Sequence, residues 1–190
     1  MATITIIKGD LLETELDIIV QQCNCITITA LGLAQAIKIK LQVDPYGHRK
    51  AIKGKKNCAQ ESDRGNPGTI TIHKSPTTGQ TVVCLYAQYS PGKPGIYHQS
   101  EVQKNNIQDT SEQRLHWFKE CLKLLKQYLD TLLETPESNS RKKNKIRIGL
   151  PYLIGCGLAG GNWQEYKTAL DEWTTTLDPN QVEILLVHKE

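Results

Sequence analysis

The stretch IGLPYLIGCGLAGGNW, from Ile148 to Trp163, predicts a hydrophobic strand that runs into four glycines and then into a capped helix. Glycine carries no Cβ atom, so its backbone N–H group can approach a ligand closely. A row of such groups, backed by a helix N-terminus, is suited to the phosphates of a nucleotide. We therefore expect a nucleotide-like ligand at residues 155–161. The alternative is a glycine-rich turn that binds nothing.

Strand and helix patterns alternate along the rest of the chain. β-branched and apolar runs predict strands at residues 3–7, 17–22, 69–73, 81–87, 146–150 and 182–187. Apolar residues at helical spacing predict a helix at 31–38 and two longer ones, which begin at capping boxes formed by Asp109 with Glu112 and by Asn162 with Glu165. Residues 42–66 and 91–109 are interpreted as polar connections, 75–79 as a hairpin turn and 136–144 as a helix break. This order predicts a three-layer α/β/α sandwich with a mixed, largely parallel sheet and an antiparallel edge.

Length and charge limit the class of protein. The 190 residues fit one domain, spanning 1–190. A net charge of +3, from 23 basic and 20 acidic residues, does not demand a polyanionic partner, and the basic run from Arg141 to Lys145 is interpreted as a solvated loop. No apolar run reaches the roughly 18 residues that span a bilayer, and the first residues lack the pattern of a secretory signal. We expect a monomer of the cytoplasm or nucleus with no membrane partner.

The six cysteines lie mostly in apolar strand or helix patterns, so we expect reduced thiols and not a disulfide framework. A zinc site formed by Cys23, Cys25 and Cys156 is the metal hypothesis that the sequence raises. We expect no metal.

Three polar or glycine-rich segments follow predicted strands: Gly9-Asp10, residues 21–32 and residues 155–161. In open α/β sheets ligands bind outside the carboxyl ends of the strands. We therefore expect these segments to surround one cleft.

Taken in order along the whole chain, these segments resemble the macro domain, a module that binds ADP-ribose. The matching pieces are Lys8-Gly9-Asp10, Asp17-Ile18-Ile19-Val20 leading to Asn24, Gly32-Leu33-Ala34, and Pro151 to Trp163. The sequence from Gly155 to Trp163 is most similar to that of the family branch that removes ADP-ribose from acidic side chains or nucleic acid. Cys23-Asn24-Cys25 is similar to the branch that hydrolyses ADP-ribose 1''-phosphate. The resemblance implies ADP-ribose, or an ADP-ribosylated protein or nucleic acid, as the partner, and no cofactor.

The resemblance also implies roles for particular positions. Asp10, followed by Leu11, would accept from the adenine amino group, and Asn24 would donate to one hydroxyl of the distal ribose and accept from another. The ligand-binding loops implied are Gly32 with Leu33 on one side and Gly155, Cys156, Gly157, Leu158, Ala159 and Gly160 on the other. Two alternatives stay open, a plain turn at Gly9-Asp10 and an Asx-turn at Asn24.

The catalytic acids that the family uses are missing from the matching positions. One branch has a carboxylate after the first glycine loop, where this chain has Ala34. Another has an Asp in the second loop and a Lys near the end of the middle strand, where this chain has Ala159 and a neutral residue near Gln88. The glutamate pair of the branch that cleaves poly-ADP-ribose has no counterpart either.

Two functions remain after this comparison. Either the chain is a hydrolase of ADP-ribosyl conjugates, in which the ligand's diphosphate and Asn24 position the attacking water, or it is a reader that binds ADP-ribose without cleaving it. We expect the hydrolase, with Asn24 as a catalytic residue. His48, near Asp44 and Tyr46, is a second candidate because it could titrate near neutral pH; a solvated surface loop is the alternative there. A nucleic-acid-binding module is disfavoured by the lack of a surface aromatic pattern.

Overall fold

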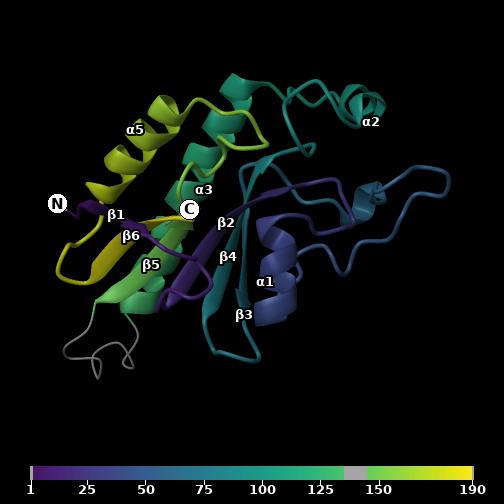
Figure 1. Cartoon of the computed structure of the whole chain (residues 1–190). Coiled ribbons are helices and arrows are strands. Elements are labelled where there is room, and N and C mark those ends of the chain that lie inside the picture. Colours follow the sequence, from purple (N-terminus) through teal and green to yellow (C-terminus); the bar gives the residue numbers. More distant parts are fainter. Residues whose placement is uncertain (1, 135–144, 190) are drawn as a thin grey trace.

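The computed structural model describes residues 2–134 and 145–189 of the chain. The strands in these residues form one mixed sheet of six, in the order β1-β6-β5-β2-β4-β3 (Figure 1). Their bounds are β1 Ile4–Lys8, β2 Ile18–Asn24, β3 Ile70–Lys74, β4 Thr81–Gln88, β5 Ile146–Pro151 and β6 Val182–His188. All neighbouring pairs are parallel except the β3–β4 hairpin at one edge. The predicted largely parallel sheet with an antiparallel edge is confirmed.

Helices cover both faces of the sheet. The helices α3 and α5 lie on one face and α1 on the other, whereas α2 lies beyond the strand ends (Figure 1). Their bounds are α1 Leu33–Leu41, α2 Gln99–Lys104, α3 Ser111–Leu133 and α5 Trp163–Thr174, with a short 3₁₀ helix, η1, at Glu61–Asp63. The predicted three-layer α/β/α sandwich is confirmed.

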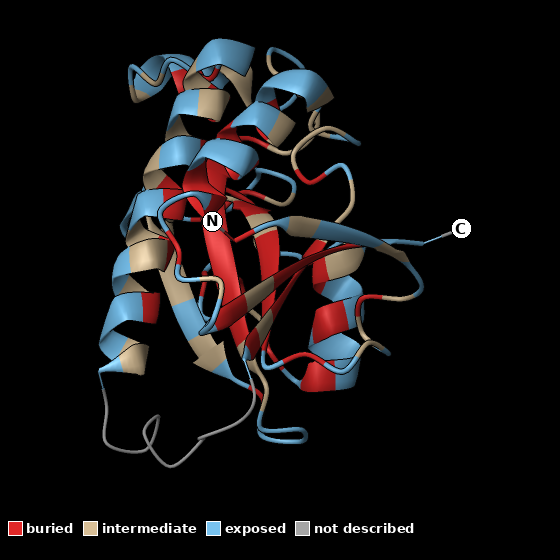
Figure 2. Cartoon of the chain, turned by 90° about the vertical axis from the view of Figure 1, so that its left-hand side faces the viewer, coloured by how far each residue is buried: buried red, intermediate tan, exposed pale blue. Residues whose placement is uncertain are grey.

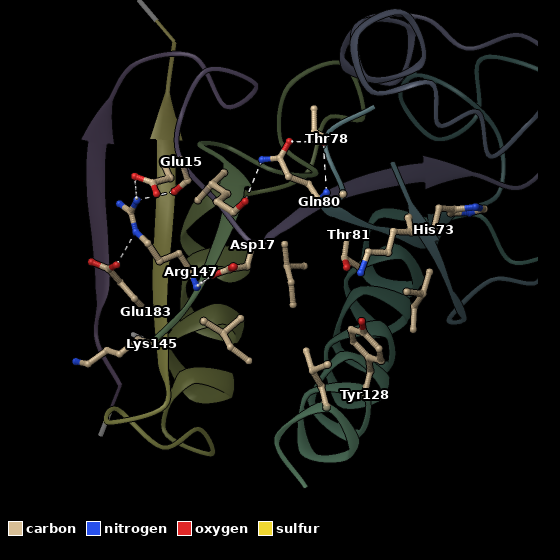
Figure 3. A pocket seen from close by; sticks show the side chains of 17 residues that line it. Glu15, Asp17, His73, Thr78, Gln80, Thr81, Tyr128, Lys145, Arg147 and Glu183 are labelled. Carbon is tan, nitrogen blue, oxygen red and sulfur yellow. Dashed lines mark hydrogen bonds and ion pairs between the residues drawn. The ribbon is translucent and has the colours of Figure 1, made fainter. Parts of the chain in front are cut away.

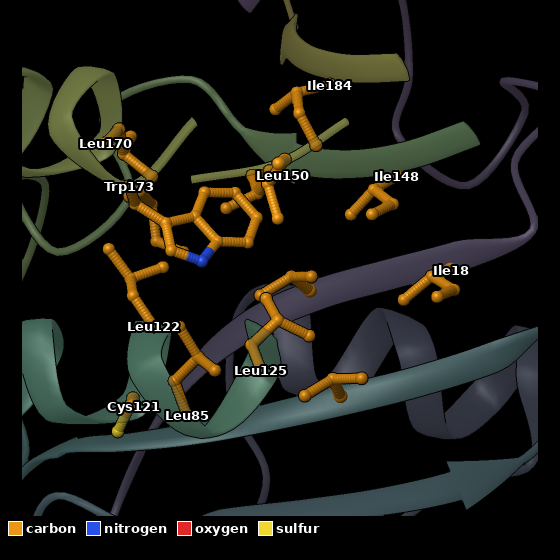
Figure 4. Packing of buried hydrophobic residues seen from close by; sticks show 14 of the residues in the cluster. Ile18, Leu85, Cys121, Leu122, Leu125, Ile148, Leu150, Leu170, Trp173 and Ile184 are labelled. Atoms are coloured by element: carbon orange, nitrogen blue, oxygen red, sulfur yellow. The ribbon is translucent and has the colours of Figure 1, made fainter. Parts of the chain in front are cut away.

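The sheet separates two apolar clusters because successive strand residues point to opposite faces. In β2, Ile18 and Val20 pack on the side of α3 and α5, whereas Ile19 packs on the side of α1. Figure 4 shows the first cluster, where α3 places Leu122 and Leu125 and α5 places Leu170 and Trp173 over strand residues that include Ile148, Leu150 and Ile184. Buried residues fill the middle of the molecule in Figure 2. With both faces sealed, the strand ends are where a ligand can reach the sheet.

Helix starts follow the sequence in one case and not in the other. Asn162 is the N-cap of α5, and its side-chain oxygen accepts from the backbone N–H of Gln164 at 3.0 Å. The predicted cap at Asp109 is wrong, because the N-cap of α3 is Thr110, whose hydroxyl accepts from the N–H of Gln113 at 3.1 Å. Asp109 is instead buried in an ion pair.

Two predicted connections also need comment. Residues 91–109 were expected to be a plain connection, but they contain α2, which buries Glu101 and Val102. The predicted break at 136–144 and all but Lys145 of the basic run lie outside the described residues.

Candidate functional site

A cavity of about 790 Å³ opens at the carboxyl ends of β2 and β4. Gln22 and Asn24 line it from the end of β2, Gln88 from the end of β4, and Leu33 and Ala34 from the start of α1. Further lining comes from four connecting segments: Tyr46; Lys56 with Asn57; residues 91–93 and 96–98; and Leu158 with Ala159. The segment around Asn24 and the late glycine loop, far apart in the sequence, therefore share one hollow.

The cavity gathers only part of the predicted site. Asn24, Leu33, Leu158 and Ala159 line it. The other members of the late loop, Gly155, Cys156, Gly157 and Gly160, are not among the lining residues but form the turn that carries Leu158 and Ala159. Gly32 is the N-cap of α1, with φ of 58°, and a Cβ atom there would meet nothing within 4 Å.

Asp10 and Leu11 lie outside the cavity lining. The carboxylate of Asp10 accepts from the N–H of Leu12 at 2.9 Å and from Lys189 Nζ at 2.7 Å. These hydrogen bonds, that of Lys189 above all, lower the pKa of Asp10. Leu11 is buried in the cluster on the α1 side. A turn begins at Asp10, whose carbonyl accepts from the N–H groups of Glu13 and Thr14, and the role of Asp10 toward adenine stays a prediction.

His48 also lies outside the lining and is exposed, so the geometry gives this predicted catalytic residue no place at the cavity. Its neighbour Tyr46 lines the cavity instead and is buried, and its hydroxyl oxygen accepts from the N–H of Asn24 at 3.3 Å. The polar loop that holds both residues therefore places Tyr46 at the cavity and His48 in solvent.

The oxygen of the Asn24 side chain is engaged in hydrogen bonds, whereas its nitrogen is free. Its Oδ1 accepts from the N–H of Ile26 at 3.1 Å, from the N–H of Thr27 at 2.8 Å and from Thr27 Oγ1 at 2.9 Å. The Asx-turn is therefore real, and the oxygen is committed to it. The Nδ2 group has no acceptor among the described residues, so only the donor half of the predicted role remains available to Asn24.

Steric crowding explains two of the glycines in the late loop, Gly155 and Gly161. Gly155 has φ of +74°, in the left-handed region, and a Cβ atom there would lie 2.3 Å from Cε1 of Tyr166. At Gly161 a Cβ atom would lie 2.6 Å from the carbonyl oxygen of Gly155. The loop is thus folded tightly onto Tyr166 of α5, which only glycine permits.

The tip of this loop leaves backbone donors free. The N–H groups of Cys156, Gly160 and Gly161 donate to carbonyls within the loop or just before it, at 2.8–3.0 Å. Those of Gly157, Leu158 and Ala159 donate to no described residue. Across the cavity, α1 begins without a side-chain cap, and the first N–H groups of a helix have no partner within it. The helix N-terminus at the cavity is that of α1, not that of the capped α5.

The charge of the lining is positive. Lys56 and Lys93 line the cavity, and no Asp or Glu does so in the part of the chain that the structure describes. The stem of Lys93 rests on the loop, since a Cβ atom at Gly160 would lie 2.8 Å from its Cγ. The nearby carboxylate of Glu101 is occupied by Arg64, at 2.6 Å, and by Lys55. An anion entering the cavity would find uncommitted positive charge.

The floor of the cavity is a pair of amides. Gln22 Nε2 donates to Gln88 Oε1 at 2.8 Å, and Gln88 Nε2 donates to the carbonyl of Ser90 at 3.2 Å. The buried Oε1 of Gln22 has no hydrogen-bond partner among the described residues. Gln88 is the last residue of β4, the middle strand of the sequence comparison. A neutral residue was expected there, where one branch of the family has a lysine.

Comparison with solved structures identifies the fold. The chain aligns over its whole length with the macrodomain of Thermus aquaticus DarG, at 16% identity, a TM-score of 0.59 and 99% of that chain covered. The macrodomain of Mycobacterium tuberculosis DarG gives 13% identity and a TM-score of 0.54, with 99% of this chain and 98% of that one covered. The chain has the macrodomain fold.

A third similar structure is that of Thermosipho africanus DarTG in complex with ADP-ribose, at 12% identity and a TM-score of 0.52, covering all of this chain and 42% of that one. No family model matches the sequence. No curated protein matches it either. The predicted resemblance to the macro domain is confirmed at the level of the fold.

A buried ion pair that sequence reasoning missed ties two loops of the macrodomain cavity together. Arg114 Nε donates to Asp109 Oδ1 at 2.6 Å, and Arg114 Nη1 donates to the carbonyls of Gly92, at 2.5 Å, and Ala159, at 3.3 Å. Burial alone would raise the pKa of Asp109, but the hydrogen bonds from Arg114 and Ser90 outweigh it and lower the pKa. One indication was available in the sequence: a cation in the first turn of a helix opposes the helix dipole and needs an acidic partner.

Exposed apolar side chains surround the cavity. Leu31, Ile96, Tyr97 and Leu158 all line it, with exposed fractions of 66%, 61%, 54% and 87%. Large apolar residues that remain in solvent around one opening indicate a binding surface. They would suit the flat face of a base or the carbon skeleton of a sugar.

A second, larger groove of about 960 Å³ lies at the opposite end of the sheet (Figure 3). Asp17, Thr81, Arg147 and Glu183, at the amino ends of β2, β4, β5 and β6, line it. Unlike the cavity, it is lined by carboxylates that are engaged: Arg147 Nε donates to Glu183 at 2.9 Å, and the backbone N–H of Arg147 donates to Asp17 at 2.9 Å. We regard the cavity at the carboxyl ends as the candidate site, because ligands of such sheets bind there.

The described residues give no metal or membrane assignment. No group of three or more His, Cys, Asp or Glu side chains in residues 2–134 and 145–189 is placed to hold a metal ion. Cys23 and Cys25 belong to the cluster on the α1 side, whereas Cys156 packs against the other cluster. Among the described helices, none has the length and apolarity needed to cross a membrane.

Proposed function

We propose that this chain binds ADP-ribose, free or attached to a protein or nucleic acid, in the cavity at the carboxyl ends of β2 and β4. The observation that carries the proposal is a pair of uncommitted donor rows. One is formed by the N–H groups of the lining residues Leu158 and Ala159 with that of the adjacent Gly157, and the other is the uncapped start of α1. A diphosphate needs many donors and no nearby carboxylate, and the lining offers both, with Lys56 and Lys93 in addition. The ADP-ribose seen in the Thermosipho africanus DarTG structure supports the same ligand for this fold.

We also propose that a bound conjugate is hydrolysed at the distal ribose. Asn24 Nδ2 is free to donate to a ribose hydroxyl, while the Asx-turn holds its side chain in place. A ligand held by both donor rows would present its distal ribose in one orientation, and positioning of this kind can supply much of a rate enhancement.

The second candidate is a reader that binds ADP-ribose without cleaving it. The observation that favours it is the absence of any Asp or Glu from the cavity lining, within the described chain. A carboxylate is the commonest acid or base at glycosidic bonds. The two candidates share the binding site and differ only in turnover.

Calorimetric titration of ADP-ribose into wild type, Asn24→Asp and Asn24→Ala tests the binding proposal. Asp can accept the three hydrogen bonds of the Asx-turn but cannot donate, so N24D should keep its melting temperature. It should lose affinity by at least about three- to tenfold, the value of one hydrogen bond, because the new carboxylate also repels the diphosphate. N24A should lose similar affinity and also stability, because the N–H groups of Ile26 and Thr27 lose their acceptor. Absence of heat from wild type at about millimolar ADP-ribose would contradict binding.

A panel of conjugates separates hydrolase from reader. ADP-ribosylated protein, ADP-ribosylated nucleic acid and ADP-ribose 1''-phosphate would be incubated side by side with wild type and N24D. Release of ADP-ribose by wild type, reduced in N24D at saturating substrate, supports hydrolysis. Binding of all conjugates without release supports the reader.

A further inference from the structure

We propose that His98 is the general base of this cavity, which takes a proton from the water that attacks the distal ribose; the inference rests on the hydrolysis proposed above. The sequence offered no reason to choose this histidine over the others. The fold places it among the lining residues of the cavity, together with Asn24 and Gln88. No other histidine lines the cavity in the part of the chain that the structure describes.

The backbone holds His98 in an unusual conformation. It is the N-cap of α2 with φ of 54° and ψ of 32°, in the left-handed region that is uncommon for a residue other than glycine. Its carbonyl accepts from the N–H of Glu101 at 2.9 Å and from the N–H of Val102 at 3.0 Å, which fixes the turn. The backbone at His98 is therefore fixed at the edge of the cavity.

The imidazole is free to act. Neither ring nitrogen of His98 forms a hydrogen bond with a described residue, and the side chain is half-buried. A structural histidine in such a place usually has its ring nitrogens engaged by neighbouring groups. The ring of His98 therefore retains both positions for water or ligand.

The charges around His98 favour the neutral imidazole, which is the form that a base needs. Burial is the largest cause that lowers its pKa, and the cations of Arg64 and Lys55 lower it further. The carboxylate of Glu101 opposes them, but it is itself paired with both cations. The remaining titratable groups of the cavity lining are Tyr46, Lys56, Lys93 and Tyr97.

Neither Tyr46 nor the two lysines can replace His98 at neutral pH. Burial raises the pKa of Tyr46 well above its ordinary value, and its hydroxyl oxygen already accepts from the N–H of Asn24. Lys56 and Lys93 are exposed ammonium groups, which have no free electron pair. Imidazole is the side chain whose ordinary pKa suits proton uptake near pH 7.

The step balances without a further reactant. The water oxygen forms a bond to C1'' of the distal ribose as the bond from C1'' to the conjugated oxygen or nitrogen breaks. The leaving group departs with the electron pair of that bond. One proton of the water passes to a ring nitrogen of His98 and then to the leaving group or to solvent, so that neither oxidation nor reduction occurs.

The test compares wild type, His98→Asn and the matched control His48→Asn. Asn tolerates the left-handed backbone but cannot take up a proton near neutral pH. We expect H98N to bind ADP-ribose within about threefold of wild type and to lose about 100-fold or more of the single-turnover rate. H48N, changed at an exposed histidine outside the lining, should match wild type in both measurements.

The pH profile provides a second readout. The wild-type rate should fall as pH is lowered through a pKa below the ordinary histidine value of about 6.5, because the protonated imidazole is not a base. H98N should lack this acid limb. Should H98N fail to fold, a wild-type profile that is flat from about pH 5 to 8 would overturn the inference by itself, and an acid limb in that range would support it.

The remaining outcomes separate this inference from the proposed function. If H98N hydrolyses conjugates as fast as wild type, His98 is not the base and the hydrolase proposal stands. If wild type binds ADP-ribose but releases nothing from any conjugate, the role of His98 is overturned while binding stands. If wild type does not bind ADP-ribose, the proposed function fails before His98 is reached.

Discussion

The two ends of the sheet are built from the same strands, but their polar groups are used differently. At the carboxyl ends of β2 and β4, N–H groups and two lysines are left uncommitted around a cavity that has no carboxylate in its described lining. At the amino ends, the guanidinium of Arg147 is paired with Glu183, and the backbone N–H of Arg147 donates to Asp17 (Figure 3). The groove at the amino ends is the larger hollow, about 960 Å³ against 790 Å³. Free backbone N–H groups and the lack of a carboxylate in the described lining therefore distinguish the candidate site better than volume does.

The ion pairs at the two ends of the sheet differ in burial. Behind the cavity, Arg114 and Asp109 are buried and hold the loops at Gly92 and Ala159. At the groove, the side chains of Arg147 and Glu183 are 35% and 40% exposed. A buried pair that also holds two loops can keep free donors aimed at a ligand, whereas the exposed pair is open to solvent.

The largest expected effect comes from removing one arginine at each end. Arg114→Met should reduce the free energy of unfolding by about 3–5 kcal/mol, because it leaves Asp109 buried without its partner. Arg147→Met, the matched control, should cost about 0–1 kcal/mol, as exposed pairs do. Urea unfolding monitored by circular dichroism measures both. Equal losses of unfolding free energy in the two variants would show that the buried Arg114–Asp109 pair stabilises the fold no more than the exposed Arg147–Glu183 pair does.

A smaller effect is expected from exchanging one lysine at each end. Lys93→Gln should weaken ADP-ribose binding by about two- to fivefold, the value of one partly exposed charge. Lys74→Gln, at an exposed lysine that lines the groove, should leave the affinity unchanged. Titrations at low and high salt would check the cause, since the difference between K93Q and wild type should shrink as screening increases. A larger loss of affinity in K74Q than in K93Q would indicate that ADP-ribose binds in the groove at the amino ends of the strands, which contradicts the account.

Local patterns in the sequence predicted the fold well. The β-branched runs gave the strands, Asn162 gave the start of α5, and the Pro- and Gly-bearing turn at 75–79 gave the β3–β4 hairpin. These features depend on residues close in sequence. The glycines at 155 and 161 belong to the same class, because their requirement arises from a tight loop packed on the helix that follows it.

The parts of the site that the sequence did not predict depend on contacts between distant segments. Asp109 had the spacing of a helix cap, but the structure uses it to hold Arg114. His48 and His98 look alike in the sequence, and only the fold shows that His98 lines the cavity. Asp10 lies at a strand end as expected, yet Lys189, from the other end of the chain, occupies its carboxylate.

The central claim is that ADP-ribose binds at the carboxyl ends of β2 and β4 through uncommitted backbone N–H groups. Titration of ¹⁵N-labelled protein with ADP-ribose, followed by amide chemical shifts, tests it most directly. The account predicts the largest shifts at Gly157, Leu158 and Ala159 and at Leu33 and Ala34, with Lys74 and Arg147 unmoved. Shifts concentrated at Lys74 and Arg147, or no shifts at saturating ligand, would contradict it.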